Sequence, residues 1–159
     1  MRKGIGIWQA IMVILLVSGM MMVVLKYASI SARHVTDSYV SEQAELYLNS
    51  VIEKTLLAIS QCDRSTGLGC GGLTVGNCLS GFQDSIALSR GKAYSANVNI
   101  ERYYLFSGSD DAQNNWCAGL ETEIQTPESH GYVLLNVEVN ATIDGKLRSR
   151  IIRRTLQRP

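Results

Sequence analysis

The sequence predicts an α+β fold, in which one long N-terminal helix, half transmembrane and half amphipathic, packs on a small C-terminal antiparallel β-sheet. Neither glycine nor proline occurs between Gly19 and Gly67, so nothing in that stretch interrupts a helix. A segment rich in glycine and cysteine follows, and helical periodicity is lost there. The chain ends in two segments on either side of Asp144-Gly145, a pattern typical of a β-hairpin.

The average composition conceals segments of different character. The chain has 159 residues, of which 46% are apolar and 18% are charged, and its formal net charge is +1. This length excludes two large domains, and the presence of only two prolines argues against a disordered or linker-rich protein. The near-neutral charge argues against a general nucleic-acid-binding protein.

The first segment is predicted to span a membrane. Residues 1–4 form a short segment with two basic side chains, and residues 5–25 carry no charge. A helix over residues 5–25 covers about 30 Å, the thickness of the hydrocarbon core of a bilayer. A secretory signal peptide is the rival interpretation, but its apolar core is shorter, and no small-x-small cleavage site follows Leu25.

The cysteines orient this segment better than the basic residues do. Arg2 and Lys3 precede the span and Lys26 and Arg33 follow it, so the basic residues are nearly balanced. All four cysteines lie after the span, as expected for disulfides in an oxidising compartment. We therefore expect a single-pass membrane protein whose N-terminus is cytoplasmic and whose remaining chain lies outside, in an oxidising compartment such as a bacterial periplasm.

The helix is expected to continue through residues 26–60 as a periplasmic amphipathic segment. Its apolar residues recur at spacings of three and four, and acidic and amide residues occupy the opposite side. The apolar set is Val40, Ala44, Tyr47, Leu48, Val51, Ile52, Leu56 and Ile59, and the polar set is Glu42, Glu45, Asn49 and Glu53.

Residues 61–159 are predicted to form a globular, β-rich region held by two disulfides. Cys62, Cys70 and Cys78 are evenly spaced and Cys117 is remote, so one bridge is local and the other ties the glycine-rich loop to the sheet. The spacing leaves the pairing open. A zinc site is the rival interpretation, but the two-residue gaps of zinc knuckles are missing.

Strands are expected at residues 95–106, 120–126, 132–143 and 146–156, and residues 61–81 are expected to form a loop. The hydrophobic pattern also predicts the register of the last two strands.

A two-residue turn alone would pair Val139 with Arg150 and mix apolar with basic residues. A shift of one residue, through a three-residue loop or a bulge, pairs Val139 with Ile151 and Ile143 with Leu147. We expect the shifted register.

The order of these features resembles that of the type IV pilin and type II secretion pseudopilin superfamily. The resemblance rests on Arg2-Lys3-Gly4 before an unbroken apolar helix, followed by an amphipathic continuation, a disulfide-held loop and a C-terminal sheet. It implies that a prepilin peptidase cuts between Gly4 and Ile5 and methylates Ile5. It also implies assembly with other pilin or pseudopilin subunits, starting from the inner-membrane lipid.

Gln9 departs from the pattern of this superfamily. Subunits of the filament shaft usually carry a glutamate at the fifth position after the cleavage glycine, where its carboxylate pairs with a neighbour's terminal amine. An amide can accept a hydrogen bond but cannot neutralise that amine. The glutamate is dispensable chiefly in minor subunits at the filament tip, so Gln9 indicates a minor, tip-located pseudopilin. Alternatively, Gln9 is one tolerated polar residue in a membrane anchor.

The sequence offers no constellation for catalysis. It contains no glycine-rich phosphate loop, metalloprotease helix or serine elbow, so we expect neither an enzyme nor a resident cofactor or metal. The loop with Asp110 and Asp111 has oxygen ligands suited to calcium, as in major pseudopilins, but it lacks ordered ligand spacing and is interpreted as a solvated turn.

The C-terminal strand is strongly basic, with five arginines among the last twelve residues. DNA or acidic subunits could bind it, but protection of a sheet edge is the favoured interpretation, so DNA is the less favoured partner. The alternative to a filament subunit is an uncleaved, single-pass anchor that presents a periplasmic binding module.

Overall fold

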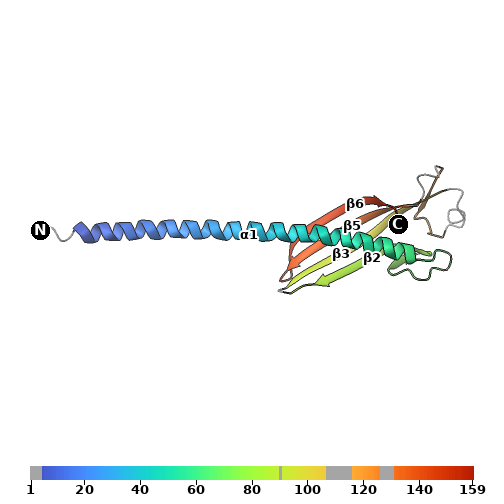
Figure 1. The fold of residues 1–159 in the computed structure, drawn as a ribbon, viewed down its shortest axis with the longest axis horizontal. Coiled ribbons are helices and arrows are strands. Elements are labelled where there is room, and N and C mark those ends of the chain that lie inside the picture. Colours follow the sequence, from blue (N-terminus) through green and yellow to red (C-terminus); the bar gives the residue numbers. More distant parts are fainter. Residues whose placement is uncertain (1–4, 90, 107–115, 126–130) are drawn as a thin grey trace. The chain divides into compact units, whose positions relative to one another are not determined.

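A computed structural model describes residues 5–89, 91–106, 116–125 and 131–159. One helix, α1 (Ile5–Gln61), precedes all six strands (Figure 1). The strands are β1 (Leu73–Val75), β2 (Cys78–Ala87), β3 (Lys92–Phe106), β4 (Glu121–Ile124), β5 (Tyr132–Ile143) and β6 (Lys146–Gln157). The chain divides into two compact units, residues 1–39 and residues 40–159, and the second is called the head unit below.

The head unit contains a single sheet with the strand order β1-β2-β3-β5-β6, in which all these neighbours are antiparallel. β4 departs from this pattern because it pairs with β3 in parallel. β3 is long enough for β2 to pair along residues 93–99 and for β4 to pair along residues 103–106, while β5 occupies the other edge. The predicted α+β class is confirmed, with one parallel strand added to the antiparallel sheet.

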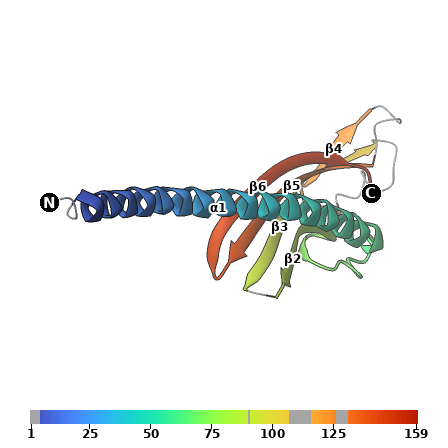
Figure 2. The same cartoon turned by 60° about the vertical axis from the view of Figure 1, so that its left-hand side comes forward.

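The core of the head unit lies between α1 and one face of the sheet, the inner face (Figure 2). Side chains alternate along β5 and, on either side of an irregularity between Ile100 and Arg102, along β3, so every second residue of these stretches is buried against the helix. The predicted apolar helix face is confirmed, because Val40, Ala44, Leu48, Val51, Ile52 and Ile59 are buried and Tyr47 and Leu56 pack against the core. The predicted polar residues Glu42, Glu45, Asn49 and Glu53 are exposed.

The prediction of a loop over residues 61–81 is wrong for residues 73–75 and 78–81. β1 and the start of β2 lie there, with Cys78 and Leu79 buried. The local pattern hides these strands, because Gly81 and the polar residues around it interrupt the alternation, and β2 is held by its pairing with β3.

The hairpin of β5 and β6 combines the two registers considered from the sequence. Asp144-Gly145 forms a two-residue turn, so Ile143 faces Lys146 and the predicted Ile143–Leu147 pair is wrong. A bulge between Ala141 and Thr142 then shifts the register by one residue. The predicted Val139–Ile151 pair is therefore confirmed, and Asp144 adopts a positive φ of 51°, which suits an aspartate in such a turn.

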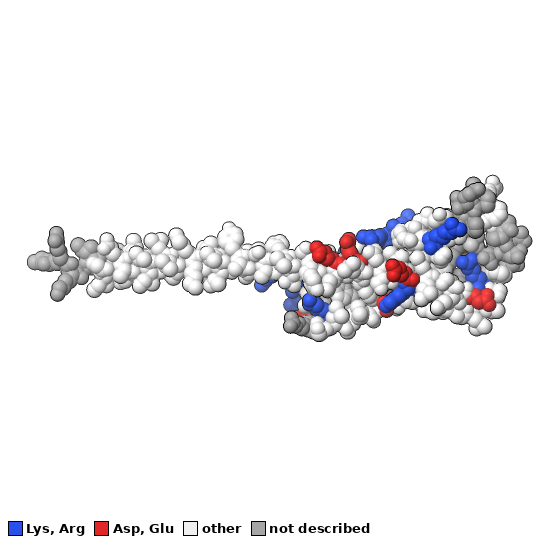
Figure 3. All heavy atoms as spheres, viewed as in Figure 1, with Lys and Arg blue, Asp and Glu red and all other residues white. Residues whose placement is uncertain are grey.

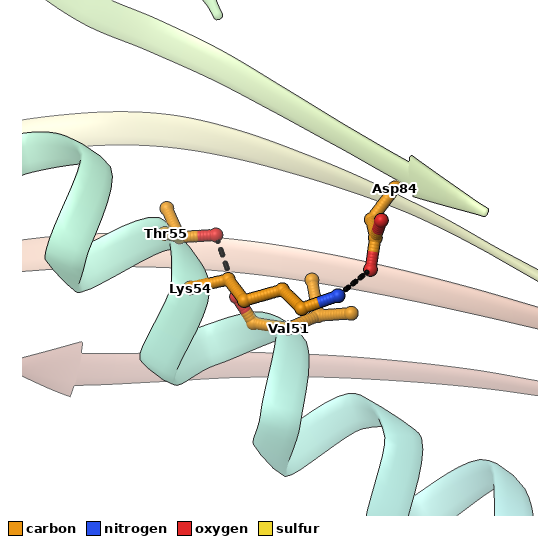
Figure 4. Close-up of polar contacts among 4 residues, drawn as sticks. All are labelled: Val51, Lys54, Thr55 and Asp84. Atoms are coloured by element: carbon orange, nitrogen blue, oxygen red, sulfur yellow. Dashed lines mark hydrogen bonds and ion pairs between the residues drawn. The ribbon is translucent and has the colours of Figure 1, made fainter. Parts of the chain in front are cut away.

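A polar contact joins α1 to β2 at the edge of this core (Figure 4). Lys54 donates a hydrogen bond to Asp84, with 2.7 Å between the ammonium nitrogen and the carboxylate oxygen. This bond lowers the pKa of the Asp84 carboxyl below its usual value. Close by on the helix, the buried Thr55 donates its hydroxyl proton to the Val51 carbonyl at 2.8 Å, so the helix itself satisfies that polar group.

Two tyrosines, the buried Tyr103 and the partly buried Tyr47, differ in whether their hydroxyls make hydrogen bonds. Tyr103 donates to the Leu79 carbonyl at 2.6 Å, and burial raises the pKa of its phenol. Tyr47 packs on Tyr94 with 5.8 Å between ring centroids. Burial and the nearby Asp84 carboxylate raise the pKa of the Tyr47 phenol, but its hydroxyl makes no hydrogen bond of acceptable geometry within the described residues.

These tyrosines form a matched pair for a stability test. Tyr103→Phe leaves the buried Leu79 carbonyl without its donor and should lower the free energy of unfolding of the head unit by about 1–2 kcal/mol. Tyr47→Phe removes an unsatisfied hydroxyl and should be neutral or slightly stabilising. Urea denaturation of the full chain in detergent, followed by near-ultraviolet circular dichroism, measures both changes. Equal losses in the two variants would contradict this assignment.

The Lys54–Asp84 contact predicts a pH dependence. Because the folded pKa of Asp84 is depressed, its contribution is present above the unfolded value of about 3.9 and is lost as the pH falls through the folded pKa. Asp84→Asn should lower stability by about 0.5–1 kcal/mol at pH 7, since Lys54 is half exposed, and this difference should vanish in acid. Lys54→Gln is the reciprocal control. Urea midpoints that stay parallel for wild type and Asp84→Asn down to pH 2 would contradict the prediction.

Candidate functional site

The apolar surface of α1 within residues 5–39 is the most pronounced functional feature of the chain. From Gly6 to Tyr39 every side chain is exposed, and the large apolar side chains are between 46% and 78% exposed. Figure 3 shows this segment without charge over most of its length. The helix is long and apolar enough to cross a membrane, and its most apolar window has no buried part. Such a surface is stable in lipid or against other apolar helices.

Polar side chains in this segment differ in how they are satisfied. The hydroxyls of Ser18, Ser29 and Thr36 donate to backbone carbonyls three or four residues earlier, at 2.9–3.1 Å. Within the described part of the chain, the side-chain amide of Gln9 has no hydrogen bond, and it lies beside Trp8 and Met12 in a shallow groove. An unpaired amide is costly in hydrocarbon, so Gln9 is the polar side chain of this segment whose surroundings matter most.

The residues predicted for processing lie at the start of this segment. Ile5 is the first residue of α1. Gly4 and the rest of the predicted leader, residues 1–4, lie outside the described residues. The predicted cleavage between Gly4 and Ile5 therefore stays a prediction.

The cysteines form two disulfides, Cys62–Cys70 and Cys78–Cys117. One bridge is local and the other long, as the spacing predicts. The local bridge closes the turn that ends α1, where Gly69 approaches the Gln61 carbonyl so closely that a Cβ would lie 2.7 Å from that oxygen. Gly69 also has a positive φ of 79°, so the turn needs glycine there.

Asp63 organises the same turn. Its carboxylate accepts hydrogen bonds from the Ser65 amide and hydroxyl and from the Thr66 hydroxyl, at 2.7–2.9 Å. These bonds lower the pKa of the Asp63 carboxyl. All the Asp63 oxygens thus have donors from the protein, so this aspartate stabilises the loop.

The long bridge ties the segment before β4 to the start of β2. Beside it, the Asn77 amide donates to the Trp116 carbonyl at 2.8 Å, and the Cys117 amide donates to the Glu121 carboxylate at 2.9 Å. β4 is therefore held at the sheet by a disulfide and by backbone bonds. This position explains why a strand that the sequence shows only weakly is formed.

Three of the four arginines of β6 contact carboxylates, which come from three different elements. Arg150 contacts Glu138 at 2.9 Å, Arg153 contacts Glu45 at 3.4 Å, and Arg154 contacts Glu101. The contact with Arg150 lowers the pKa of the Glu138 carboxyl. Figure 3 accordingly shows basic and acidic side chains interleaved on the head unit.

A polar hollow of about 470 Å³ lies on the sheet face turned away from α1. It is lined chiefly by amide and hydroxyl side chains, those of Gln83, Ser85, Ser95, Asn97 and Asn140. These groups can donate and accept hydrogen bonds, but none of them is an activated nucleophile or a base.

No cluster of three or more histidine, cysteine, aspartate or glutamate side chains suited to a metal occurs among the described residues. The Asp110-Asp111 loop lies outside them.

Comparison with known proteins gives no assignment: no family model, no curated protein and no solved structure matches this chain.

The two disulfides should contribute unequally to stability. They close loops with sequence separations of 8 and 39 residues, and loop-closure entropy grows with loop length. Replacing Cys78 and Cys117 by serine should cost about 4 kcal/mol, and replacing Cys62 and Cys70 about 2.5 kcal/mol. Urea midpoints of the two double variants, measured on the full chain in detergent, test this order. A larger loss from the local bridge would contradict it.

Proposed function

We propose that this chain is a minor pilin-like or pseudopilin-like subunit of a filament assembled in the bacterial inner membrane, in a type II secretion or type IV pilus-like system. A prepilin peptidase would cut it after Gly4, leaving Ile5 as the methylated first residue. The N-terminus would face the cytoplasm and the head unit the periplasm. The two disulfides of the head unit support the oxidising compartment.

The single observation that carries the proposal is the continuity of α1. From Ile5, the first residue that the structure describes, it runs without interruption to Gln61, and its buried residues start at Val40. A helix that is apolar on all sides can exchange lipid for identical helices with little change in solvation. The same helix can therefore serve as a membrane anchor before assembly and as the packed core of a filament afterwards.

Gln9 supports a minor subunit at the filament tip. Its amide is exposed and lacks a partner within the described residues, so it can accept one hydrogen bond from a neighbouring subunit. It cannot neutralise a neighbour's terminal amine, which a shaft subunit must do. A tip subunit has no subunit ahead of it and does not need that carboxylate.

The proposal predicts that processing depends on Gly4. In cells that contain the peptidase, mass spectrometry should find a mature chain beginning with methylated Ile5, and Gly4→Ala should accumulate the longer precursor. Gly6→Ala is the matched control, because an added Cβ there meets no atom within 4 Å and the cleavage glycine stays intact. This variant should be processed normally.

Two results would decide against a filament subunit. An intact residue 1–4 leader on the wild-type protein in such cells would favour the uncleaved anchor with a periplasmic binding module. Processing of Gly4→Ala at the wild-type rate would lead to the same conclusion.

A further inference from the structure

β6 forms one margin of the sheet. It pairs with β5 along its whole length, and no described strand pairs with its other side. Figures 1 and 2 both show β6 at the margin next to β5. An edge strand presents unpaired backbone N–H and C=O groups to which another extended chain can pair. With 12 residues, β6 is long for an unprotected edge.

The face of β6 turned away from α1 alternates apolar and basic side chains. We call this row the β6 strip, and it consists of Leu147, Arg150, Ile152, Arg154 and Leu156, which pair with outer-face residues of β5. Its three apolar members are 57%, 59% and 51% exposed. Neighbouring members within the regular part of the strand are about 6.6–6.8 Å apart.

Edge protection explains only part of the β6 strip. Arginines and the bulge near the turn do discourage nonspecific pairing. A strand selected purely for protection would not also expose Ile152 and Leu156 beside the open edge. The β6 strip therefore combines a free backbone edge, apolar contact area and positive charge.

The charged side chains on and near β6 indicate which kind of molecule could pair with its free edge. β6 carries one lysine and four arginines, and Arg158 follows it, which gives six positive charges. Three carboxylates, Glu45, Glu101 and Glu138, offset half of them. An excess of three remains. A second β6 is disfavoured, because antiparallel pairing centred on Ile152 would place Arg150 opposite Arg154 of the other copy.

Duplex DNA fits this surface less well than a polypeptide strand does. DNA binding draws on many cations that neutralise phosphates, and the excess here is only three positive charges. DNA also makes no use of the backbone edge or of Ile152 and Leu156. An extended polypeptide can use the backbone groups, the apolar side chains and the remaining charge together.

We propose that β6 is a β-strand addition site for another polypeptide, whose extended segment alternates carboxylate and apolar side chains on one face. The carboxylates would lie beside Arg150 and Arg154, and the apolar side chains beside Ile152 and Leu156. The side chains of Arg150 and Arg154 are 53% and 65% exposed, so each guanidinium has N–H donors left beside its contact with Glu138 or Glu101. This inference goes beyond the proposed filament function and does not depend on it, because the site lies wholly within the head unit.

The test uses the full chain in detergent micelles and a fluorescent peptide of repeating Glu-Thr-Val-Thr units. Fluorescence anisotropy should report saturable binding that empty micelles do not give. A peptide with lysine in place of glutamate, and a labelled DNA duplex, should bind at least about tenfold more weakly. Hydrogen exchange should slow at alternate β6 amides when the acidic peptide is bound, because strand addition pairs the outward N–H groups.

Matched lysine variants separate the β6 strip from general surface effects. Ile152→Lys should weaken peptide binding about tenfold by removing the central apolar contact. Leu57→Lys is the control, since Leu57 on α1 is 58% exposed and Ile152 is 59% exposed. Leu57→Lys should bind the peptide like wild type.

Several outcomes would overturn the proposal. Absence of saturable peptide binding would do so, as would equal binding of the acidic and lysine peptides. Peptide binding without slower exchange in β6 would place the contact elsewhere. DNA binding that is lost in Ile152→Lys, together with no peptide binding, would make this edge a nucleic-acid surface instead.

Discussion

The contact between the apolar face of α1 and the inner face of the sheet is the constraint on which the head unit depends. Every second residue of β3 and β5 points to this contact, and Val51 and Leu48 from the helix and Val98 and Val137 from the sheet are fully buried in it. The alternation fixes which face of each strand is left for solvent or partners, because a slip of one residue would turn the whole apolar set outward.

The disulfides and the polar contacts complete this arrangement where the apolar contact ends. The Cys62–Cys70 bridge holds the turn that leaves the helix, and the Cys78–Cys117 bridge ties the β4 segment to β2. Lys54 and Asp84 join the helix to β2 at the edge of the core. These links hold elements whose own sequences carry weak strand signals, which is why the small domain can include glycine-rich segments.

The proposed functions use two different surfaces of the same chain. The exposed apolar helix within residues 5–39 requires lipid or other helices around it, and Gln9 leaves an amide available to a neighbour. The β6 strip is a mixed surface in which backbone groups, apolar contact and charge coincide. A filament subunit with such an edge could bind one polypeptide laterally while its helix packs with others.

The sequence by itself determined the elements that depend on local periodicity. The helix continues because no glycine or proline breaks it, its buried face follows from spacings of three and four, and β5 and β6 follow from alternation around Asp144-Gly145. The Val139–Ile151 pair could also be predicted, since only the shifted register keeps apolar residues together. The candidate membrane span could be predicted in the same way.

Tertiary structure alone decided the features that join distant segments. β2 is held by its pairing with β3. β4 pairs in parallel with the last residues of β3, which β2 leaves unpaired. The pairing of the four cysteines follows from the positions of these strands. The Lys54–Asp84 contact could not be predicted from the sequence either. For the β6 strip, the sequence offers the alternation of arginine with isoleucine and leucine, but not the position of β6 at the edge of the sheet. Local sequence carries periodicity, whereas the choice of partner depends on what the rest of the chain places nearby.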